Sequence, residues 1–391
     1  MGGTIKKEIR CDLLICGAGL AGLSLVYRAL KAGLWQQQTI IIVTPTAQRE
    51  NDKTWSFWKK DAGVFDELIS KSWNQLSVFC NAGEQIQLNT GDYSYNTIRS
   101  IDFYEHVLSY LHTQENVQFF YEQVLSLDTN AFSCIAKTDY HFIRSVYAFN
   151  SIFELPKLRE GQQYFLQHFK GVIIEVNALN MHVDEAYLMD YRTGQEHGTT
   201  FFYTLPLSST SLFVEYTLFS KVLLEQDLYD LAIENYIKDV LKIKSYNITH
   251  TEVGVIPMTD HHFQRTRGNI INIGTIGGDT RGATGYTFIN IQKTISEILH
   301  VWEISNSPIP IKESISAKHK LYDSILLNVL DRREYAGHEL FCDLFKNTDA
   351  CKIFEFLDAE SSLLKDLRII LSLRPLPFVK AVKNALYSRF F

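Results

Sequence analysis

Hydrophobic and polar positions follow two different periods along the chain, and each change of period marks a predicted element. Residues 13–15 form a short apolar run, and apolar side chains then recur three or four apart over residues 20–33. This pattern predicts a strand, a tight turn and a helix. A second apolar run at 39–43 follows at the spacing of a parallel crossover, and 100–113 and 117–121 repeat the helix and strand patterns. The early chain therefore predicts a parallel sheet with crossover helices.

The middle and the end of the chain have other patterns. A hairpin is predicted at 132–143, followed by a separate strand at 145–151 that returns to the sheet. Long strands with turn-rich gaps occupy 161–219, which predicts an antiparallel sheet, and an amphipathic helix follows at 223–241. Residues 311–391 are predicted to be helical.

A glycine-rich turn joins the first predicted strand to the first helix. Gly17 makes the turn, Gly19 lets the backbone approach a pyrophosphate, and Gly22 lets the helix pack against the strand. Because this GxGxxG motif stands in its full strand–helix–strand context, it predicts a dinucleotide site. The alternative is a glycine-rich turn without a ligand. The candidate binding residues are Gly17, Ala18, Gly19, Leu20, Ala21 and Gly22.

One part of the dinucleotide pattern is missing. An acid normally ends the second strand and binds the adenosine ribose. Here the strand ends in Val43-Thr44-Pro45. Thr44 offers only a weaker hydroxyl bond, and Glu50 or Asp52 would have to reach back. The prediction of a dinucleotide stands, whereas the ribose contact is open.

A second glycine cluster lies late in the chain. A strand at 269–273 leads into five glycines within the twelve residues from Gly274 to Gly285, and a helix is predicted from about Tyr286. A second backbone approach suits one extended cofactor, flavin adenine dinucleotide (FAD), with Asp279 bonding the ribityl hydroxyls. A solvated loop is the alternative. The candidate residues here are Gly274, Gly277, Gly278, Asp279 and Gly285.

Composition narrows the classes of function. The formal net charge of −6 argues against nucleic acid as a partner. The 25 Phe, 20 Tyr and 5 Trp either fill a core or line a long apolar pocket. Trp55, Phe57 and Trp58 are predicted to lie in a polar loop, as core anchors or as a lining for ligand. Six cysteines without metal-ligand spacing predict free buried thiols in a reducing compartment and no metal site.

The C-terminal segment differs in charge from the rest. Residues 365–391 hold six basic side chains against one acid, interleaved with apolar residues. Such a segment can lie on an anionic membrane surface, here through Arg374, Phe378, Lys380 and Lys383. An ordinary solvated helix is the alternative. Because no apolar run is long enough to span a bilayer, we expect a cytoplasmic protein.

Glu215 is the foremost candidate for chemistry. Burial among apolar groups would raise its pKa, so that the carboxyl could remain protonated near neutrality and act as a general acid. A carboxylate that faces solvent or pairs with a lysine is the alternative. Asp190 is a similar but weaker candidate, because Arg192 is near in sequence. The neighbours of Glu215 in its predicted strand are Leu212, Phe213, Val214, Tyr216 and Leu218.

Several short motifs follow one another from about residue 10 to 300. They are GAGLAG at 17–22, Thr54-Trp55-Ser56-Phe57, Leu188-Met189-Asp190-Tyr191-Arg192, Phe202-Tyr203-Thr204-Leu205-Pro206, Phe213-Val214-Glu215-Tyr216-Thr217, Gly254-Val255-Ile256-Pro257-Met258 and Thr284-Gly285-Tyr286. In their sequence and order they resemble the bacterial lycopene beta-cyclases. A weaker likeness continues into the helical region at FLDAESSLLKDL.

The resemblance implies a flavoprotein whose reduced FAD takes part without net redox change, with NAD(P)H as the electron source. The implied substrates are lycopene and other apolar carotenes, whose ends become β rings in γ-carotene and β-carotene. Glu215 matches the glutamate thought to be the acid; plant-type relatives have a second glutamate where this chain has Tyr216. The implied location is cytoplasmic, peripherally associated with the inner membrane.

The fold class that follows is α/β, with a two-dinucleotide-type flavoprotein Rossmann domain, an inserted antiparallel β-sheet substrate lobe and a C-terminal helical region. The ranges are 1–55, 96–155 and 252–300 for the FAD-binding domain, 56–95 and 156–251 for the polyene lobe, and 301–391 for the helical region.

Two other readings remain open. An FAD-dependent monooxygenase or a polyprenyl reductase would share the architecture but carry out net redox chemistry. The aromatic hydroxylases usually continue their Gly-Asp pair with an alanine-rich stretch, whereas Thr280 and Arg281 follow Gly278-Asp279 here. A carotenoid-binding flavoprotein without turnover is the third possibility.

Overall fold

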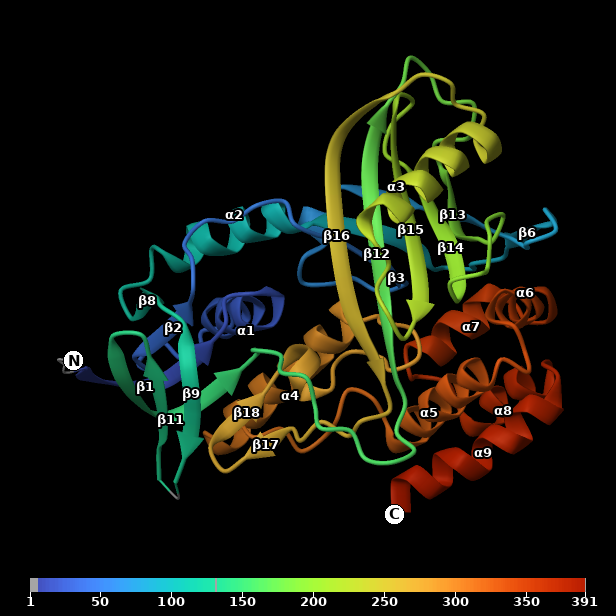
Figure 1. Ribbon diagram of the computed structural model, residues 1–391. Coiled ribbons are helices and arrows are strands. Elements are labelled where there is room, and N and C mark those ends of the chain that lie inside the picture. Colours follow the sequence, from blue (N-terminus) through green and yellow to red (C-terminus); the bar gives the residue numbers. More distant parts are fainter. Residues whose placement is uncertain (1–5, 131, 391) are drawn as a thin grey trace.

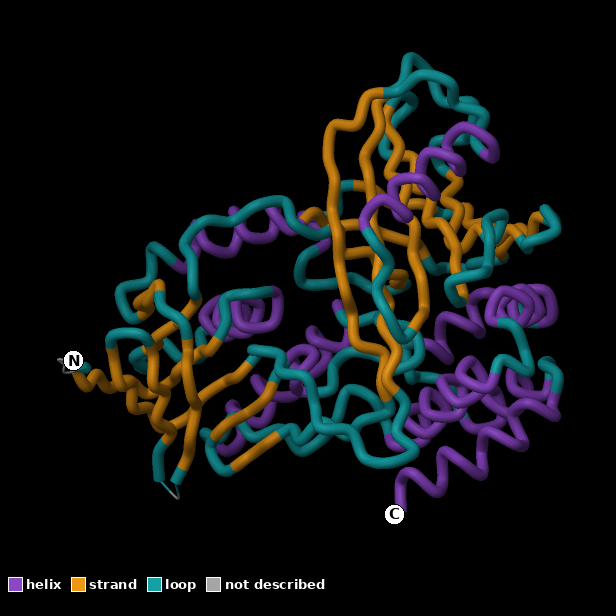
Figure 2. Tube along the Cα trace, viewed as in Figure 1, coloured by secondary structure: helices purple, strands orange, loops and turns teal. Residues whose placement is uncertain are grey.

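The computed structural model describes residues 6–130 and 132–390, except for the side chains of 386–390. A parallel sheet forms one part of the molecule, a long antiparallel sheet stands beside it, and the C-terminal helices lie below the antiparallel sheet in the view of Figure 1. Figure 2 shows how the strands and helices separate into these parts. The combination of parallel and antiparallel sheets with C-terminal helices confirms the predicted α/β fold class.

The first sheet contains the parallel strands predicted from the early chain. The parallel pairs are β1 with β2, β2 with β8, β1 with β11 and β11 with β18. Helices α1, α2 and α4 supply the apolar side chains that cover one face of it. The bounds are β1 (Lys7–Cys16), α1 (Leu20–Lys31), β2 (Ile40–Thr44), α2 (Ser100–Leu111), β8 (Val117–Tyr121), β11 (His141–Asn150), β17 (Thr266–Arg267), β18 (Ile270–Asn272) and α4 (Phe288–Ser305).

The predicted division of residues 132–151 into a hairpin and a separate strand was wrong in one respect. Strand β9 (Val124–Thr129) pairs with β10 (Cys134–Thr138), and β10 pairs with β11. β11 is one continuous strand, because Arg144 and Ser145 keep partners in β10 and in β1 without a register shift. The second strand of the hairpin and the sheet strand are therefore one element, β11.

The second sheet has the order β16-β12-β15-β14-β13-β5-β6 and is antiparallel except where β13 meets β5. Helix α3 (Gln226–Asn235) and the π-helical turn η2 (Tyr236–Val240) cover one of its faces. The predicted domain boundary at residue 251 falls inside β16; the domain ranges remain a prediction. The bounds are β5 (Gln75–Phe79), β6 (Gln85–Leu88), β12 (Tyr164–Glu175), β13 (Glu185–Asp190), β14 (Thr199–Pro206), β15 (Ser211–Ser220) and β16 (Asn247–Thr259).

A small third sheet contains the aromatic segment that the sequence placed in a polar loop. Strand β7 (Ser94–Arg99) lies between β3 (Thr54–Lys59) and β4 (Lys71–Trp73), and a short 3-10 helix η1 (Asp66–Leu68) precedes β4. The loop prediction was wrong, because every residue of β3 pairs with a residue of β7 in an antiparallel ladder. Phe57 and Trp58 are buried, while Trp55 is only half-buried.

The C-terminal region is helical, as predicted. Its helices are α5 (Ala317–Arg332), α6 (Gly337–Asn347), α7 (Ala350–Leu357), α8 (Leu363–Leu371) and α9 (Pro375–Phe390). A disulfide joins Cys80, after β5, to Cys342 in α6. The prediction of six free thiols was therefore wrong for these two; their separation of 262 residues gave no spacing signal.

Arg281 fastens the helical region to the second glycine turn. Its side chain is almost fully buried, and its Nη2 lies 2.6 Å from Oδ1 of Asp323 in α5. Nη1 also donates to the carbonyl oxygen of Leu357 at the end of α7. A buried guanidinium requires such a partner, since an unpaired charge in an apolar interior is costly.

We expect Arg281→Met to lower the free energy of unfolding by about 3–5 kcal/mol, because it leaves Asp323 buried without its cation. Chemical denaturation measures the loss. The double variant Arg281→Met/Asp323→Leu is the control and should recover most of it, since a buried pair can be replaced by apolar side chains at little cost. A single variant as stable as the parent would contradict this role.

Candidate functional site

A cavity of about 430 Å³ lies where the two glycine turns meet the inner face of the antiparallel sheet. The first turn contributes Gly19, Leu20 and Ala21, and the second contributes Gly274, Thr275, Thr284 and Gly285. The sheet contributes both acids and aromatic side chains, which include Phe169, Tyr203, Phe213, Glu215 and Glu252. The cavity thus brings together three segments that are far apart in the sequence.

The first glycine turn has the geometry that its sequence predicts. Gly17 has φ +103°, a conformation that favours glycine, and its N–H donates to Val43. A Cβ at Gly22 would lie 2.2 Å from the carbonyl oxygen of Gly17, so only glycine lets α1 pack this closely. Gly19 precedes α1 in an extended conformation, and a Cβ there would meet no atom within 4 Å. Gly19 therefore borders open space at a helix N-terminus, which suits an anion.

The end of β2 carries Thr44 where the motif would have an acid, and the nearby Arg49 contacts it. Thr44 is buried, and Nη2 of Arg49 donates to its hydroxyl over 3.3 Å. The guanidinium of Arg49 also lies 5.2 Å from the ring centre of Tyr104, which lines the cavity. Asp52 accepts a hydrogen bond from Ser100 instead of reaching back to Thr44.

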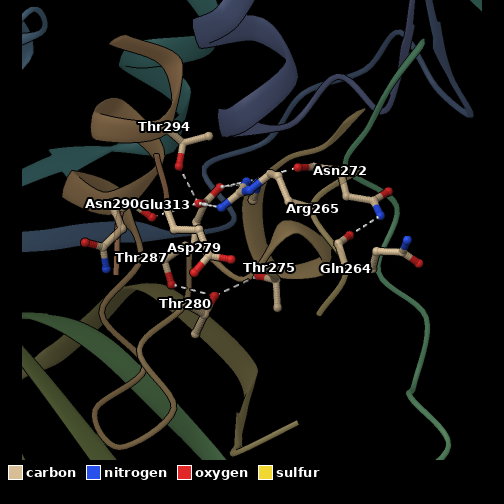
Figure 3. A network of polar contacts seen from close by, with 12 residues as sticks. Gln264, Arg265, Asn272, Thr275, Asp279, Thr280, Thr287, Asn290, Thr294 and Glu313 are labelled. Atoms are coloured by element: carbon tan, nitrogen blue, oxygen red, sulfur yellow. Dashed lines mark hydrogen bonds and ion pairs between the residues drawn. The ribbon is translucent and has the colours of Figure 1, made fainter. Parts of the chain in front are cut away.

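The second glycine turn is held in place by Asp279, as Figure 3 shows. This fully buried carboxylate accepts hydrogen bonds from Arg265 (2.6 Å), Thr294 (2.6 Å), Ser314 (3.1 Å) and the N–H of Gly274 (2.7 Å). Because all four donors belong to the protein, the structure does not support the predicted contact of Asp279 with ligand hydroxyls. Asp279 stabilises the turn from behind, and its carboxylate is occupied by these partners.

The glycines of this turn divide into two groups. Gly274 (φ +69°) and Gly285 (φ +72°) line the cavity. Gly277 and Gly278 shape the turn: a Cβ at Gly277 would lie 2.4 Å from the carbonyl oxygen of Asn272, and Gly278 has φ +80°. Neither is among the described residues that line the cavity.

Gln167 adds a polar atom that has no protein partner. Its Oε1 is buried, lines the cavity from β12 and is without a hydrogen bond among the described residues. A Cβ at Gly285 would lie 2.2 Å from this oxygen, so a glycine is needed here to leave room for it. A buried acceptor without a donor is costly, which makes it a place for a ligand donor.

Glu215 projects into the cavity from β15. Phe213, Glu215 and Thr217 share the inner face of this strand, whereas Val214 and Tyr216 pack under α3. Burial and, to a smaller extent, the negative charge of Glu252 together raise the pKa of Glu215 to about 8, although the hydrogen bond from Thr217 opposes the shift. The carboxyl group is therefore mostly protonated at neutral pH.

Aromatic rings surround this acid. The hydroxyls of Tyr203 and Tyr286 lie 3.3 Å apart, and burial raises the pKa of both phenols, and of Tyr95, well above the ordinary value. Phe213 lies over Gly171 and Phe169 over Gly254, where a Cβ would come within 2.7 Å and 2.2 Å of the rings. The wall around Glu215 is thus rich in aromatic rings, and the other charged side chains that line the cavity, among the described residues, are Glu252 and Lys53.

Asp190 lies on the other side of the sheet. Arg192 lies 2.5 Å from its Oδ2, and the hydroxyl of Tyr236 donates to the same oxygen over 2.6 Å. Tyr236 belongs to the helical layer on the outer face. Asp190 therefore does not share a cavity with Glu215, and its carboxylate is held in an ion pair.

The sequence did not single out several residues that complete the site. Glu252 stands two positions before the Gly254-Val255-Ile256-Pro257-Met258 motif, and strand alternation was the signal that could have placed it on the inner face with Gly254. Tyr95 and Arg49 gave no signal, because their positions depend on tertiary packing.

Comparisons with known proteins identify solved structures that share this fold. Solved structures with the same fold include a geranylgeranyl bacteriochlorophyll reductase-like protein from Thermoplasma acidophilum (12% identity, TM-score 0.62, 97% of this chain and 100% of that one). Others are p-nitrophenol 4-monooxygenase PnpA from Pseudomonas putida (12%, 0.56, 98% and 96%) and a variant of HpxO from Klebsiella pneumoniae complexed with FAD (14%, 0.56, 94% and 100%). At these identities the likeness concerns the fold alone.

The sequence itself matches no curated protein. The family model described as lycopene cyclase protein matches residues 12–383, which is nearly the whole chain. This match confirms the resemblance inferred from the short motifs. The chain belongs to the lycopene cyclase family.

Proposed function

We propose that the protein cyclises the ψ end groups of lycopene to β rings, giving γ-carotene and β-carotene, with no net redox change. The observation that carries the proposal is Glu215, a buried carboxyl with a raised pKa in an aromatic cavity between two glycine turns. A carboxylic acid that stays protonated at neutral pH is the group needed to start an acid-catalysed cyclisation.

The reaction begins when Glu215 delivers its proton to the terminal double bond. The next double bond attacks the resulting tertiary cation and closes the ring, and loss of a proton gives the β ring. The faces of Phe169, Phe213 and Tyr203 can stabilise the passing positive charge. An apolar wall also excludes the water that would otherwise capture the cation as an alcohol.

The cavity residues fit FAD as the cofactor. Gly19 borders open space at the N-terminus of α1, and Gln167 has an orphaned acceptor beside Gly285. Gly19, Leu20 and Ala21 would hold the pyrophosphate, and Gly274, Thr275 and Gly285 would meet the rest of the cofactor. Reduced FAD, with NAD(P)H as the electron source, supplies negative charge that stabilises a cation.

One incubation separates this function from its rivals. With lycopene and chemically reduced flavin under anaerobic conditions, a cyclase forms a product at unchanged oxidation level. A monooxygenase needs oxygen, and a polyprenyl reductase gives a product with fewer double bonds. A carotenoid-binding protein retains lycopene unchanged.

Membrane association is the second part of the proposal. Among the described residues no helix has the length and apolar content to cross a bilayer. Helices α8 and α9 nevertheless present apolar side chains to solvent, with Leu364, Leu371 and Leu376 exposed by 73%, 76% and 72%. An apolar polyene dissolves in lipid, so a helical surface that touches the membrane suits its uptake.

The charges of this surface matter less than the sequence indicated. Three basic side chains form ion pairs with acids of the preceding helical region: Lys365 with Glu355, Arg374 with Glu339 and Lys380 with Glu334. Phe378 is half-buried and packs against the core, so it offers less of its ring to lipid than the sequence indicated. The side chain of Arg389 lies outside the described part of the chain. The apolar side chains are therefore the main attraction for lipid.

We expect Leu364→Ser with Leu371→Ser to weaken binding to anionic phospholipid vesicles at least about tenfold, because two apolar side chains no longer enter the lipid. Sedimentation with vesicles at several salt concentrations measures this. Leu125→Ser, an exposed leucine (51%) on β9 far from α8, is the control and should bind like the parent. Equal binding of the double variant and the parent would contradict the proposed contact.

We expect Gly19→Val to fold normally and to lose flavin, because its side chain enters open space where the pyrophosphate would lie. The flavin-to-protein ratio and the thermal midpoint measure the two effects. Gly33→Ala, a control in a turn away from the cavity, should keep its flavin. A stoichiometrically flavinylated Gly19→Val protein would refute this placement of the cofactor.

We expect Glu215→Gln to lower turnover by an amount at or beyond the upper end of about 10²- to 10⁴-fold, because glutamine keeps the size of the side chain but has no acidic proton. In the parent, activity should be retained below a pH of about 8 and should fall above it, as Glu215 loses its proton. The titratable groups that face Glu215 are Glu252, Tyr95, Tyr203 and Tyr286.

Product formation from lycopene, with flavin content as the control, measures both effects. A glutamine variant that converts lycopene at the parental rate would show that the acid is elsewhere.

A further inference from the structure

A second carboxyl group shares the inner face of the sheet with Glu215. Gly171 of β12 pairs with Glu215 of β15 on one side and with Glu252 of β16 on the other. Residues directly opposite each other across strands lie on the same face, and two strand spacings place the two Cα atoms about 10 Å apart. Both side chains line the cavity.

The glycine between them keeps this space open. A Cβ at Gly171 would lie 2.7 Å from the Phe213 ring and 3.3 Å from Cγ of Glu252. Any larger residue would therefore displace the ring or the acid. The absence of a side chain at Gly171 leaves room on this face for the ring of Phe213 and for the side chain of Glu252.

The two acids have different environments. Glu215 accepts one hydroxyl hydrogen bond, from Thr217 (2.7 Å), and is otherwise surrounded by aromatic groups. Glu252 is bound at both oxygens: Oε1 accepts the N–H of Thr54 (3.3 Å), and Oε2 accepts its hydroxyl (2.7 Å). Its Oε2 also lies 3.8 Å from Nε2 of His250. Both oxygens of Glu252 therefore have protein donors, whereas Glu215 has one such donor.

Two carboxyl groups in one cavity with opposed environments form an acid and base pair. That the cavity takes a ligand rests on a separate observation, the buried and unpartnered Oε1 of Gln167 in its wall. We infer that Glu252 is the base that removes the proton from the ring cation, an inference that rests on the proposed cyclisation.

The proton balance closes within the cavity. Glu215 gives its proton to the terminal carbon–carbon double bond, whose electron pair forms the new C–H bond, and becomes a carboxylate. After ring closure, the C–H bond beside the cation breaks; its electron pair forms the ring double bond and its proton goes to Glu252. Transfer of that proton from Glu252 back to Glu215 restores both groups. No electron is gained or lost, and no net proton is consumed.

The test is Glu252→Gln, which keeps the acceptor for Thr54 but cannot take a proton. We expect turnover to fall by about 10²-fold or more. The residual product should contain rings with a displaced double bond, because the cation then loses a proton to another acceptor. Chromatography with NMR of the products measures both. Glu252→Asp keeps the charge and should restore the β ring at an intermediate rate.

A matched control and a pH profile separate this role from others. Glu175→Gln, on β12 of the same sheet, should behave like the parent. If Glu252 only influenced the charge of Glu215, Glu252→Gln would shift the high-pH loss of activity to lower pH and leave the maximal rate and the β-ring product unchanged. That result would overturn the inference.

Failure of the proposed function gives a different result. A parent protein that does not cyclise lycopene refutes the proposed function itself. A parent that forms β rings, together with a Glu252→Gln variant that forms them equally fast, refutes only the assignment of the base. If Glu252→Gln lost its flavin or its fold, the comparison of Glu252→Asp with the parent would decide: β rings formed more slowly would support the base, and an unchanged rate would refute it.

Discussion

The free energy of placing a carboxyl group in an aromatic cavity controls the design of this protein. An ionised carboxylate loses its hydration there, so the neutral form is favoured, and the pKa of Glu215 rises to about 8. This arrangement requires a sheet whose inner face carries large rings and whose backbone is close-packed. Gly171 and Gly254 provide the room for those rings, and α3 seals the outer face. The long antiparallel sheet therefore provides the apolar surroundings that keep Glu215 protonated.

A cavity built from distant segments also requires rigid borders. Asp279 holds the second glycine turn through Arg265 and Thr294, while Arg281 ties the same turn to Asp323 in the helical region. These buried ion pairs are weak evidence for stability, because desolvation offsets their attraction. Their value is positional: each fixes backbone that borders the cavity. The acid that the sequence assigned to a ligand, Asp279, is part of this support.

Much of the fold could be predicted from the sequence, because its signals are local. The strand–glycine–helix order, the parallel strand at 117–121 and the C-terminal helices follow from periodicity and turn residues. The burial of Glu215 could be predicted too, because its segment is apolar, but of the neighbours expected around it only Phe213 shares its face; Leu212, Val214, Tyr216 and Leu218 pack under α3. What could not be predicted depends on contacts between distant segments: the disulfide between Cys80 and Cys342, the extension of β3 by β7, and the Arg281–Asp323 pair. Glu252 belongs to this group, since its position on the same face as Glu215 depends on the register of three strands.

The fold alone does not determine the chemistry. The same architecture occurs in a p-nitrophenol monooxygenase and in a reductase-like protein, at 12% identity in each case. Both comparisons extend over nearly the whole chain, so a difference in the reaction catalysed must come from the side chains that face the cavity. An oxygen-using or reducing enzyme does not need a neutral acid at the sheet surface, whereas a cyclisation cannot begin without one. Glu215 is a buried carboxyl group that accepts a hydrogen bond from a threonine hydroxyl and lies among aromatic rings. In a redox enzyme, burying such a group would cost free energy without serving the reaction. In a cyclase the first step, protonation of the double bond, depends on this group. Glu252, on the same face of the sheet but bound by donors at both oxygens, suits the last step, removal of the proton.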